Sequence, residues 1–222
     1  MHAINADIWV LTESHAKVAP GEGYRCISQS GRADANDADE SWVSVWSRMG
    51  GIPVSTMDRD RTAAAEFSFG RSRTLVVFGT VLPWLGSTWR GVAAAKGAAF
   101  SASLAQQALD WERIRGEDPR RELCVAGDFN QDLLAVGHYY GSKAGRAAVR
   151  SALDTATLSC PTSAPSDAVH RHTAGQAAGI DHICISEGLR TANGSACVWP
   201  APNARGATLS DHFGVCITVA VS

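Results

Sequence analysis

The 222-residue sequence contains no long apolar run, no strong excess of one charge and no closely spaced pair of cysteines. No stretch approaches the roughly 18 consecutive apolar residues of a membrane-spanning helix, so the sequence predicts no membrane span. The first residues, 1–14, lack a basic segment followed by an apolar one and do not resemble a signal peptide. By default, these absences predict a cytoplasmic protein.

The charge balance argues against one class of partner. The formal net charge is −2, whereas a domain that grips nucleic acid through many phosphate contacts is usually more basic. A tight, nonspecific DNA binder is therefore not expected. A local site in which a bound metal supplies the positive charge remains compatible with this composition.

None of the six cysteines forms a Cys-x-x-Cys pair, which argues against a zinc ribbon or a thioredoxin-type motif. Cys124, Cys184 and Cys216 lie inside apolar runs, and we expect them to be small buried hydrophobes. We expect no disulfide framework, which is typical of a reducing compartment.

The patterning is that of one globular domain spanning residues 1–222, with 45% hydrophobic and 19% charged residues. Apolar runs and alternating segments predict strands over Asp7–Leu11, Trp42–Ser47, Ala63–Phe69, Thr74–Leu82, Glu122–Ala126, Ile180–Ser186, Thr191–Val198 and Phe213–Val221. Helical spacing predicts helices over Ala93–Arg115 and Ala144–Leu153. Polar and Gly/Pro-rich segments predict loops or turns over Ser28–Glu40, Gly50–Pro53, Gly70–Arg73, Pro161–Gln176 and Pro200–Thr208.

Four short segments place polar groups at the ends of apolar strands. Trp9–Glu13, Cys124–Asn130 and Leu209–Phe213 each join an apolar run to a turn with acidic or imidazole groups, and Gly179–Ile183 opens a strand with Asp-His. In Gly-Asp-Phe-Asn, extended backbone would place Asp128 and Asn130 on the same side, where they could orient a water and hold a phosphate oxygen. The alternative is a simple Asp/Asn turn at a strand end.

The acidic residues and the histidine indicate a functional site more strongly together than each does alone. Asp211 and His212 alone are compatible with a polar loop, and Asp181 with a carboxylate satisfied by turn amides. Carboxylates collected at strand ends, however, suit an oxygen-liganded cation such as Mg²⁺. A metal, an imidazole oriented by a carboxylate and a positioned water are the requirements of phosphodiester hydrolysis.

The ordered set DIWVLTES, GDFNQDLL, GIDHICIS and LSDHFGV resembles the endonuclease/exonuclease/phosphatase superfamily along nearly the whole chain. The resemblance implies an α/β (α+β) fold of the deoxyribonuclease I type, a four-layered β-sandwich flanked by helices with the site at one end. It also implies a phosphoesterase that uses Mg²⁺, or alternatively Mn²⁺, on a phosphate-ester substrate, nucleic acid among them. It implies no particular protein partner.

The resemblance also implies roles for single residues. Metal ligands would be Glu13 and Asp211, and catalytic residues would be Asp128, Asn130, Asp181 and His212. Asp128 resembles the carboxylate that orients or deprotonates the attacking water. Asn130 resembles the group that holds this carboxylate and the phosphate. His212 resembles the imidazole at the scissile phosphate, with Asp181 as its orienting partner.

Two departures from the family pattern stand out. The family normally begins with an Asn-bearing strand before the Glu-bearing one, and here Glu13 lies so close to Met1 that this strand has no place. Asn5 is too close to Asp7 to replace it, so the sequence reads as a fragment or as a natural variant. The loss of a central strand predicts unpaired strand edges and a hole in the core.

The second departure is Val81, near the position where many relatives carry a histidine or, in apurinic endonucleases, a tyrosine. Valine donates no hydrogen bond, so Arg61 and Arg90 become candidates for phosphate binding. The alternative for each is a solvated surface arginine.

Two other functions remain open from the sequence. One is a degenerate, noncatalytic member of the same fold that acts as a binding or scaffold domain. The other is a zinc-binding structural protein, which would require a metal at His170 and His172. Tyr139 and Tyr140, together with His138, could contact substrate or could simply belong to a loop. Trp84 and Trp89 could also contact substrate or could form a half-buried rim.

Overall fold

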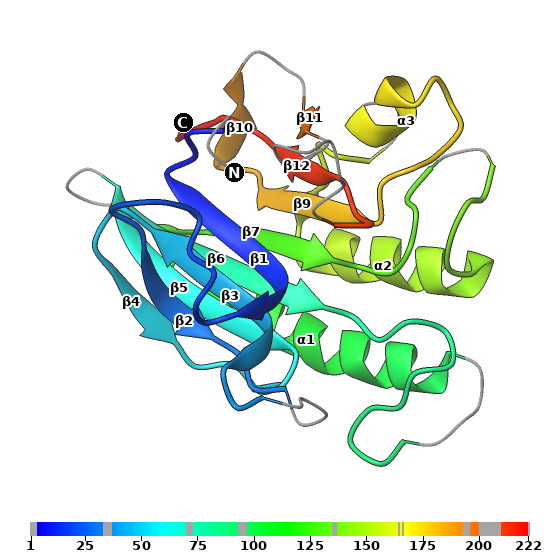
Figure 1. Ribbon diagram of the computed structural model, residues 1–222, viewed down its shortest axis with the longest axis horizontal. Helices are drawn as coiled ribbons and strands as arrows, with labels where there is room; N and C mark the ends of the chain where they lie inside the picture. Colours follow the sequence, from blue (N-terminus) through cyan, green and yellow to red (C-terminus); the bar gives the residue numbers. More distant parts are fainter. Residues whose placement is uncertain are drawn as a thin grey trace.

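A six-stranded sheet organises the computed structural model, which describes residues 4–32, 37–69, 73–92, 97–134, 137–163, 165, 167–192, 196–199 and 210–221. The strands, in spatial order, are β4 (Gly51–Val54), β5 (Thr62–Phe69), β6 (Arg73–Val81), β7 (Arg121–Asp128), β9 (Asp181–Ser186) and β8 (Leu158–Ser159) (Figure 1). Only β6 and β7 pair in parallel, and the other neighbours are antiparallel.

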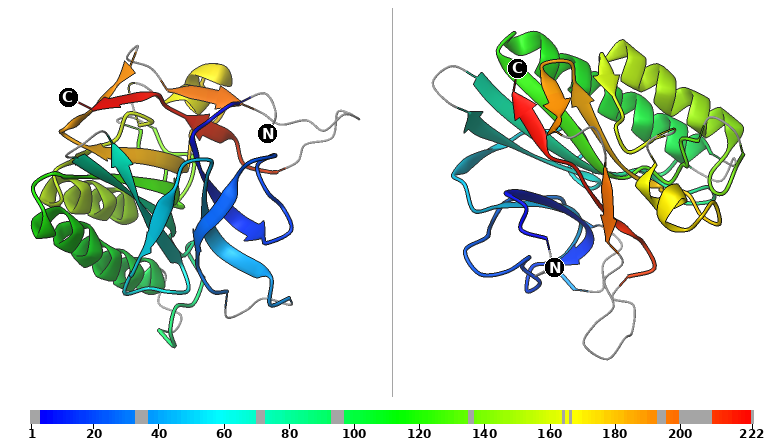
Figure 2. Two further views of the ribbon diagram at one scale, coloured as in Figure 1. Left: turned by 90° about the vertical axis from the view of Figure 1, so that its left-hand side faces the viewer. Right: turned by 90° about the horizontal axis from the view of Figure 1, so that it is seen from above.

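Two long helices cover one face of this sheet, as Figure 2 shows. They are α1 (Ala98–Glu117) and α2 (Lys143–Thr155). Helix α1 provides the crossover that a parallel strand pair requires, and it ends where Asp118, the residue before a proline, turns extended. Beneath the helices lies an apolar cluster in which the rings of Phe78 and Trp111 meet edge to face. This cluster fixes the ends of β6 and β7, from which the site is built.

Three smaller sheets form a second layer on the opposite face (Figure 2). One sheet has the order β1 (Ile8–His15), β3 (Glu40–Ser47), β2 (Arg25–Gln29). Two further pairs are β10 (Leu189–Thr191) with β13 (Val219–Val221), and β11 (Cys197–Trp199) with β12 (Gly214–Cys216). Buried Val43, Val45, Phe67 and Val77 join the layers in a second apolar cluster. A short helix, α3 (Ala168–His172), lies against β11.

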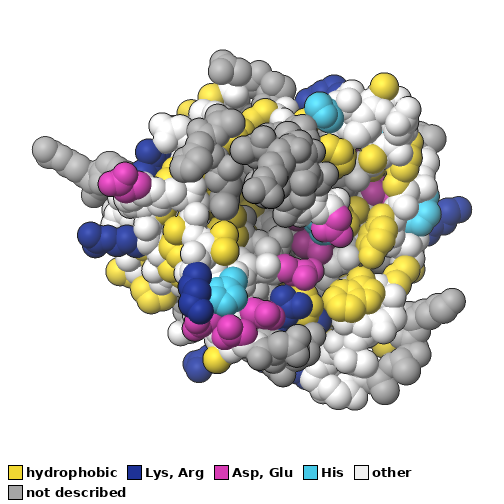
Figure 3. All heavy atoms as spheres, in the orientation of Figure 1, with side chains coloured by type: hydrophobic (Ala, Val, Ile, Leu, Met, Phe, Trp, Pro, Cys, Tyr) yellow, Lys and Arg dark blue, Asp and Glu magenta, His cyan; other side chains and the backbone are white. Residues whose placement is uncertain are grey.

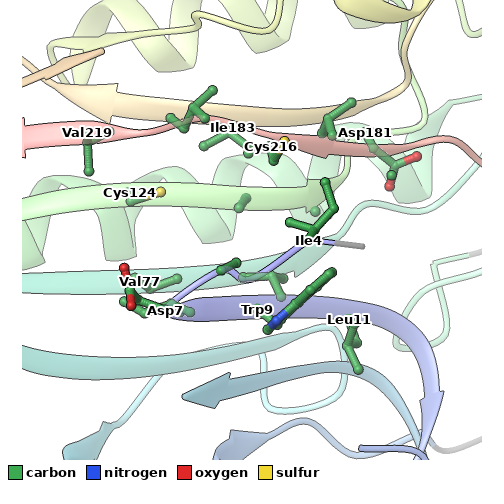
Figure 4. A pocket seen from close by; sticks show the side chains of 18 of the residues that line it. Ile4, Asp7, Trp9, Leu11, Val77, Cys124, Asp181, Ile183, Cys216 and Val219 are labelled. Atoms are coloured by element: carbon green, nitrogen blue, oxygen red, sulfur yellow. The ribbon is translucent and has the colours of Figure 1, made fainter. Parts of the chain in front are cut away.

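A cavity of about 530 Å³ interrupts this second layer. Its lining includes β1 on one side, β12 and β13 on the other, and Cys124 and Ala126 of β7 beneath (Figure 4). Among the described residues, β1 pairs only with β3, β12 only with β11 and β13 only with β10. The described residues thus leave a cavity and singly paired strands at the place where the sequence predicts a hole in the core and unpaired edges.

Several element boundaries differ from the sequence-based predictions. Gly50–Pro53 is not a turn but mostly part of β4, which tolerates Pro53 because it is an edge strand. The loop Pro161–Gln176 contains α3, whose first turn is capped by the Asp167 side chain. The strands predicted over 191–198 and 213–221 are each replaced by shorter pieces. Residues 70–72 and 200–208, predicted as a turn and a loop, lie outside the described residues.

The expectation of no disulfide is wrong. Cys197 and Cys216 occupy directly opposite positions of β11 and β12 and are joined by a disulfide. Cys216 is therefore not the small buried hydrophobe that its apolar neighbours indicated, whereas Cys184 is fully buried as expected. The pairing depends on a strand register that the cysteine spacing does not reveal. In the described part of the chain, no helix is long and apolar enough to cross a membrane.

Candidate active site

Two carboxylates face each other at one end of the six-stranded sheet. The antiparallel register of β7 and β9 places Asp128 directly opposite Asp181. His212 reaches them from the segment before β12, and its Nδ1 atom lies 2.7 Å from Oδ2 of Asp181. Ligating atoms of these three residues all lie within 4.8 Å of one another. The structure therefore brings together three residues that are far apart in the sequence.

Asn130 holds the carboxylate of Asp128 in place. Its backbone N–H donates to Oδ1 of Asp128 and its side-chain amide donates to Oδ2, both at 2.8 Å. The same amide also donates to the Leu82 carbonyl at 2.8 Å. Asn130 adopts φ 48° and not the extended backbone that we assumed, so its side chain folds back onto Asp128. Phe129 between them is fully buried, as expected.

Gly127 is required by the close approach of β6. Its φ is 138°, and an added Cβ would lie 2.0 Å from the Thr80 carbonyl oxygen. No side chain fits there without backbone displacement. The glycine thereby lets β7 deliver Asp128 next to the end of β6.

The carboxylate of Asp128 is crowded by negative charge. Burial, repulsion from Asp181 and, to a smaller extent, repulsion from Glu13 raise the pKa of Asp128 to about 7. The hydrogen bond to Asp181 is the main cause that raises the pKa of His212 to about 9. A site with an ionisable carboxyl and a cationic imidazole side by side suits acid–base chemistry near neutral pH.

The donor chemistry also fits a hard divalent cation. Oxygen ligands of several carboxylates converge, and Asp181 and Glu13 both repel the ionised form of Asp128. Glu13 stands beside this centre: its side chain is 52% exposed, and a carboxylate oxygen lies 3.8 Å from the Arg32 guanidinium. Asp211 is exposed and acts electrostatically on His212.

Val81, at the end of β6, lies directly opposite Asp128 of β7 in the sheet. It is fully buried in the second apolar cluster and offers nothing to a substrate. Its N–H donates to the carbonyl of Arg61, which is only 6% exposed and stacks its guanidinium over the Trp42 ring at 4.2 Å. Arg61 is therefore not a solvated surface residue.

The sequence-based reasoning missed Arg32, whose guanidinium lies 4.1 Å from the centre of the Trp42 ring and also pairs with Glu13. No motif marks Arg32, and only the fold brings it to the site. Arg90 is partly exposed and engaged elsewhere, because its guanidinium donates to the Met57 carbonyl and pairs with Asp58.

A loop beside the site is held by Asp132. Its buried carboxylate accepts the backbone N–H groups of Tyr139 and Tyr140 at 2.9 and 3.0 Å. Burial and the nearby charge of Asp128 raise the pKa of Tyr140, which places its phenol near the carboxylate centre. Both tyrosine side chains are exposed.

The two candidate zinc ligands do not gather with further ligating groups. The ring of His170 meets Tyr139 edge on, and the ring of His172 meets Phe213. Within the described ranges, neither belongs to a cluster that could hold a metal. Figure 3 shows acidic and basic side chains next to one another near the middle of one face, with hydrophobic side chains beside them.

The sequence profile of the Endonuclease/Exonuclease/phosphatase family matches residues 1–212. The chain belongs to this family. Family membership supports a hydrolase that acts on phosphoesters, and the family is generally dependent on divalent metal ions. No curated protein matches the chain.

Solved structures of the same family share the fold. An AP endonuclease from Archaeoglobus fulgidus is 15% identical, with a TM-score of 0.66 over 97% of this chain and 89% of that one. The catalytic domain of human Nocturnin is 15% identical, with a TM-score of 0.60 over 97% and 81%. A humanised D. rerio TDP2 is 12% identical, with a TM-score of 0.58 over 97% and 85%. These likenesses confirm the expected deoxyribonuclease I-like α/β sandwich.

Proposed function

We propose that residues 1–222 form a single catalytic domain that hydrolyses phosphodiester or phosphomonoester bonds with the help of Mg²⁺. The observation that carries the proposal is the constellation of Asp128, Asp181 and His212 at one end of the sheet. Nucleic acid is the substrate class that the AP endonuclease likeness favours. Mn²⁺ is the alternative metal.

In this proposal, Glu13 and Asp211 would hold the cation. When bound, the cation stabilises negative charge on the phosphoryl and leaving oxygens. Such a cation would also offset the repulsion that Asp181 and Glu13 exert on Asp128, which adds to burial in raising the pKa of Asp128. The oxygen-rich donor set matches the ligand preference of Mg²⁺.

Asp128 and His212 each carry out one proton transfer. Water attacks phosphorus in line, and its proton passes to the carboxylate of Asp128, whose orientation Asn130 fixes. Asp181 occupies Nδ1 of His212, so Nε2 is the nitrogen left to face the substrate. Nε2 donates its proton to the leaving oxygen. A single protonation state of the site therefore contains both the cationic acid, His212, and the anionic base, Asp128.

Arg61 is our candidate for the phosphate contact that Val81 cannot make. The two residues are hydrogen-bonded neighbours in the row that contains Asp128. The guanidinium is held by the rings of Trp42 and Trp84, at 4.2 and 6.0 Å from their centres. An arginine fixed in this way loses little conformational freedom when it binds an anion.

The test is hydrolysis of bis-p-nitrophenyl phosphate and of plasmid DNA, with Mg²⁺ and with EDTA. We expect metal-dependent turnover that falls by roughly 10²–10⁴-fold in Asp128→Asn and in His212→Ala. Asp118→Asn is the matched control, because among the described residues the hydrogen bonds to this half-buried carboxylate all come from Arg120. Turnover that persists in EDTA or in both site variants would refute the assignment.

Two observations favour a second candidate function. The interrupted second layer and the buried Val81 are what a noncatalytic binding or scaffold domain would tolerate. Folded protein, shown by circular dichroism, that lacks turnover with either metal would support this alternative.

A further inference from the structure

Two cysteines oppose each other at the β8 edge of the six-stranded sheet. β8 and β9 are antiparallel, with Ser159 opposite Ile185, and one further step of this register places Cys160 opposite Cys184. Both side chains lie on the face covered by the helices, where Cys184 belongs to the first apolar cluster and Cys160 packs against it. Opposed residues of antiparallel strands have Cα atoms about 4.5–5.5 Å apart, a separation that a disulfide can bridge.

Polar groups surround the sulfur of Cys160. The Thr162 hydroxyl lies 3.5 Å from this sulfur and 3.4 Å from Nδ1 of the buried His182, whose Nε2 donates to the Gln131 carbonyl at 3.0 Å. A hydrogen bond with the Cys184 thiol, helped by the imidazole, lowers the pKa of Cys160 well below its ordinary value. Burial raises the pKa of Cys184. The pair therefore combines one thiol that ionises readily with one that stays protonated.

Exposure and direction distinguish the cysteines of this region. Cys160 is partly exposed, whereas Cys184 is fully buried. Cys124 lies opposite Ile185 on β7 and lines the cavity on the other face of the sheet (Figure 4), because alternate residues of a strand face opposite sides. We expect a small oxidant to reach Cys160 first, whereas a bulky aromatic reagent requires unfolding. Cys184 is then the thiol placed to bond to it.

We propose that Cys160 and Cys184 form a redox-active dithiol that hydroperoxides convert into a disulfide. The Cys160 thiolate attacks a peroxide oxygen, so that an S–O bond forms and the O–O bond breaks. The leaving oxygen takes up the proton released by Cys160 and departs as water or an alcohol, which leaves a sulfenic acid. The Cys184 sulfur then attacks the Cys160 sulfur. The S–S bond forms, the S–O bond breaks, and the hydroxyl departs as water with the proton of Cys184.

The disulfide would form close to the candidate active site. Cys184 follows Asp181 by three residues on β9, and His182 between them bonds to Gln131, the residue after Asn130. Oxidation nevertheless uses none of the groups assigned to phosphoester hydrolysis. It can therefore be measured whether or not the chain hydrolyses phosphoesters.

The first test uses the unaltered protein and hydrogen peroxide. After the peroxide is removed with catalase, the remaining thiols are alkylated in denaturant and the protein is cleaved with trypsin, which places Cys124, Cys160 and Cys184 in the separate peptides 122–143, 151–171 and 172–190. We expect mass spectrometry to find 151–171 joined to 172–190. The free thiols counted after unfolding should fall from four to two.

The exposed Cys26 provides an internal comparison in the same sample. Burial of its thiol raises the pKa of Cys26 although the residue is exposed. The disulfide should therefore form at least about tenfold faster than Cys26 is oxidised. Oxidation of Cys26 at an equal or higher rate, or a link from 151–171 to 122–143, would overturn the proposal.

Substitutions provide a second test, with folding verified by circular dichroism. Cys184→Ser should stop the reaction at the sulfenic acid of Cys160, which dimedone captures. Cys124→Ser is the matched control and should leave the yield of the disulfide unchanged, because this side chain faces the cavity. An unmodified Cys160 after peroxide treatment of both the parent and Cys184→Ser would also overturn the proposal.

Discussion

The hydrogen bond between His212 and Asp181 should control the charge of the imidazole. Its pKa is about 9 against an ordinary 6.5, and Asp181 is the first cause. At about 1.4 kcal/mol per pH unit, the shift corresponds to roughly 3 kcal/mol. Because the His212 side chain is 30% exposed, solvent screening reduces this to roughly 2 kcal/mol. Asp181→Asn should therefore lower the pKa of His212 by about 1.5 units, to about 7.5, and Asp128 and Asp211 still favour the cation.

The assay is an NMR titration of the His212 ring in metal-free protein, with His212→Ala to assign the signal. Asp211→Asn is the matched control, because Asp211 is the last of the causes that raise this pKa and should change it little. A pKa of His212 that stays near 9 in Asp181→Asn, or that falls equally in Asp211→Asn, would refute the reasoning.

The same pair predicts a pH dependence of stability. The folded-state pKa of His212 is raised, so the stabilisation is fully present below 6.5 and is lost as pH rises through about 9. The difference in unfolding free energy between the parent and Asp181→Asn should shrink by roughly 2 kcal/mol between pH 6 and 10. Repulsion between Asp128 and Asp181 reduces the same free-energy difference as pH rises. Ionisation of Asp128 through about pH 7 destabilises the parent, whereas Asp181→Asn has no charge at this position to repel it. Urea titrations at both pH values measure the difference.

Three further outcomes follow from particular residues. Gly127→Ala should lower the unfolding free energy by about 3 kcal/mol or more in urea, because its Cβ would lie 2.0 Å from a carbonyl oxygen of β6, whereas Gly50→Ala, with nothing within 4 Å, should have little effect. The native oxidised protein should release one equivalent of thionitrobenzoate from Ellman's reagent, from exposed Cys26, and the other three free thiols only on unfolding; one fast thiol in excess of this would contradict the structure. With Mg²⁺, kcat/KM should rise with pH as Asp128 ionises and fall at higher pH as His212 loses its proton, with both midpoints below the metal-free values of about 7 and about 9 because the cation favours the deprotonated forms; a flat profile would exclude these two as base and acid.

Local pattern predicted most of the elements, and it marked the residues that the structure brings together in the candidate site. Apolar runs marked the strands that carry Glu13, Asp128 and Asp181, since buried strands need continuous apolar side chains. Helical spacing marked α1 and α2, although α1 begins at Ala98, after Gly97 in the left-handed conformation. The pattern failed where an element is short or lies at an edge, as in β4 and α3, because few residues then carry its period.

The geometry of the site was beyond the sequence. The motifs name Asp128 and Asn130, but only the folded backbone turns Asn130 back onto the carboxylate at φ 48°. Arg32 carries no motif and reaches Glu13 only through the packing of its guanidinium over Trp42.

The sequence by itself determined which chemical groups this protein has and which strands present them. Composition, strand period and turn residues act over a few neighbouring positions, and these suffice to place Asp128 and His212 at the ends of apolar segments. The tertiary structure alone decided that Asp128 opposes Asp181, that Cys197 meets Cys216, and that a cavity separates β1 from β12. Each depends on strand register and on which edges remain unpaired, and packing across the whole domain sets both.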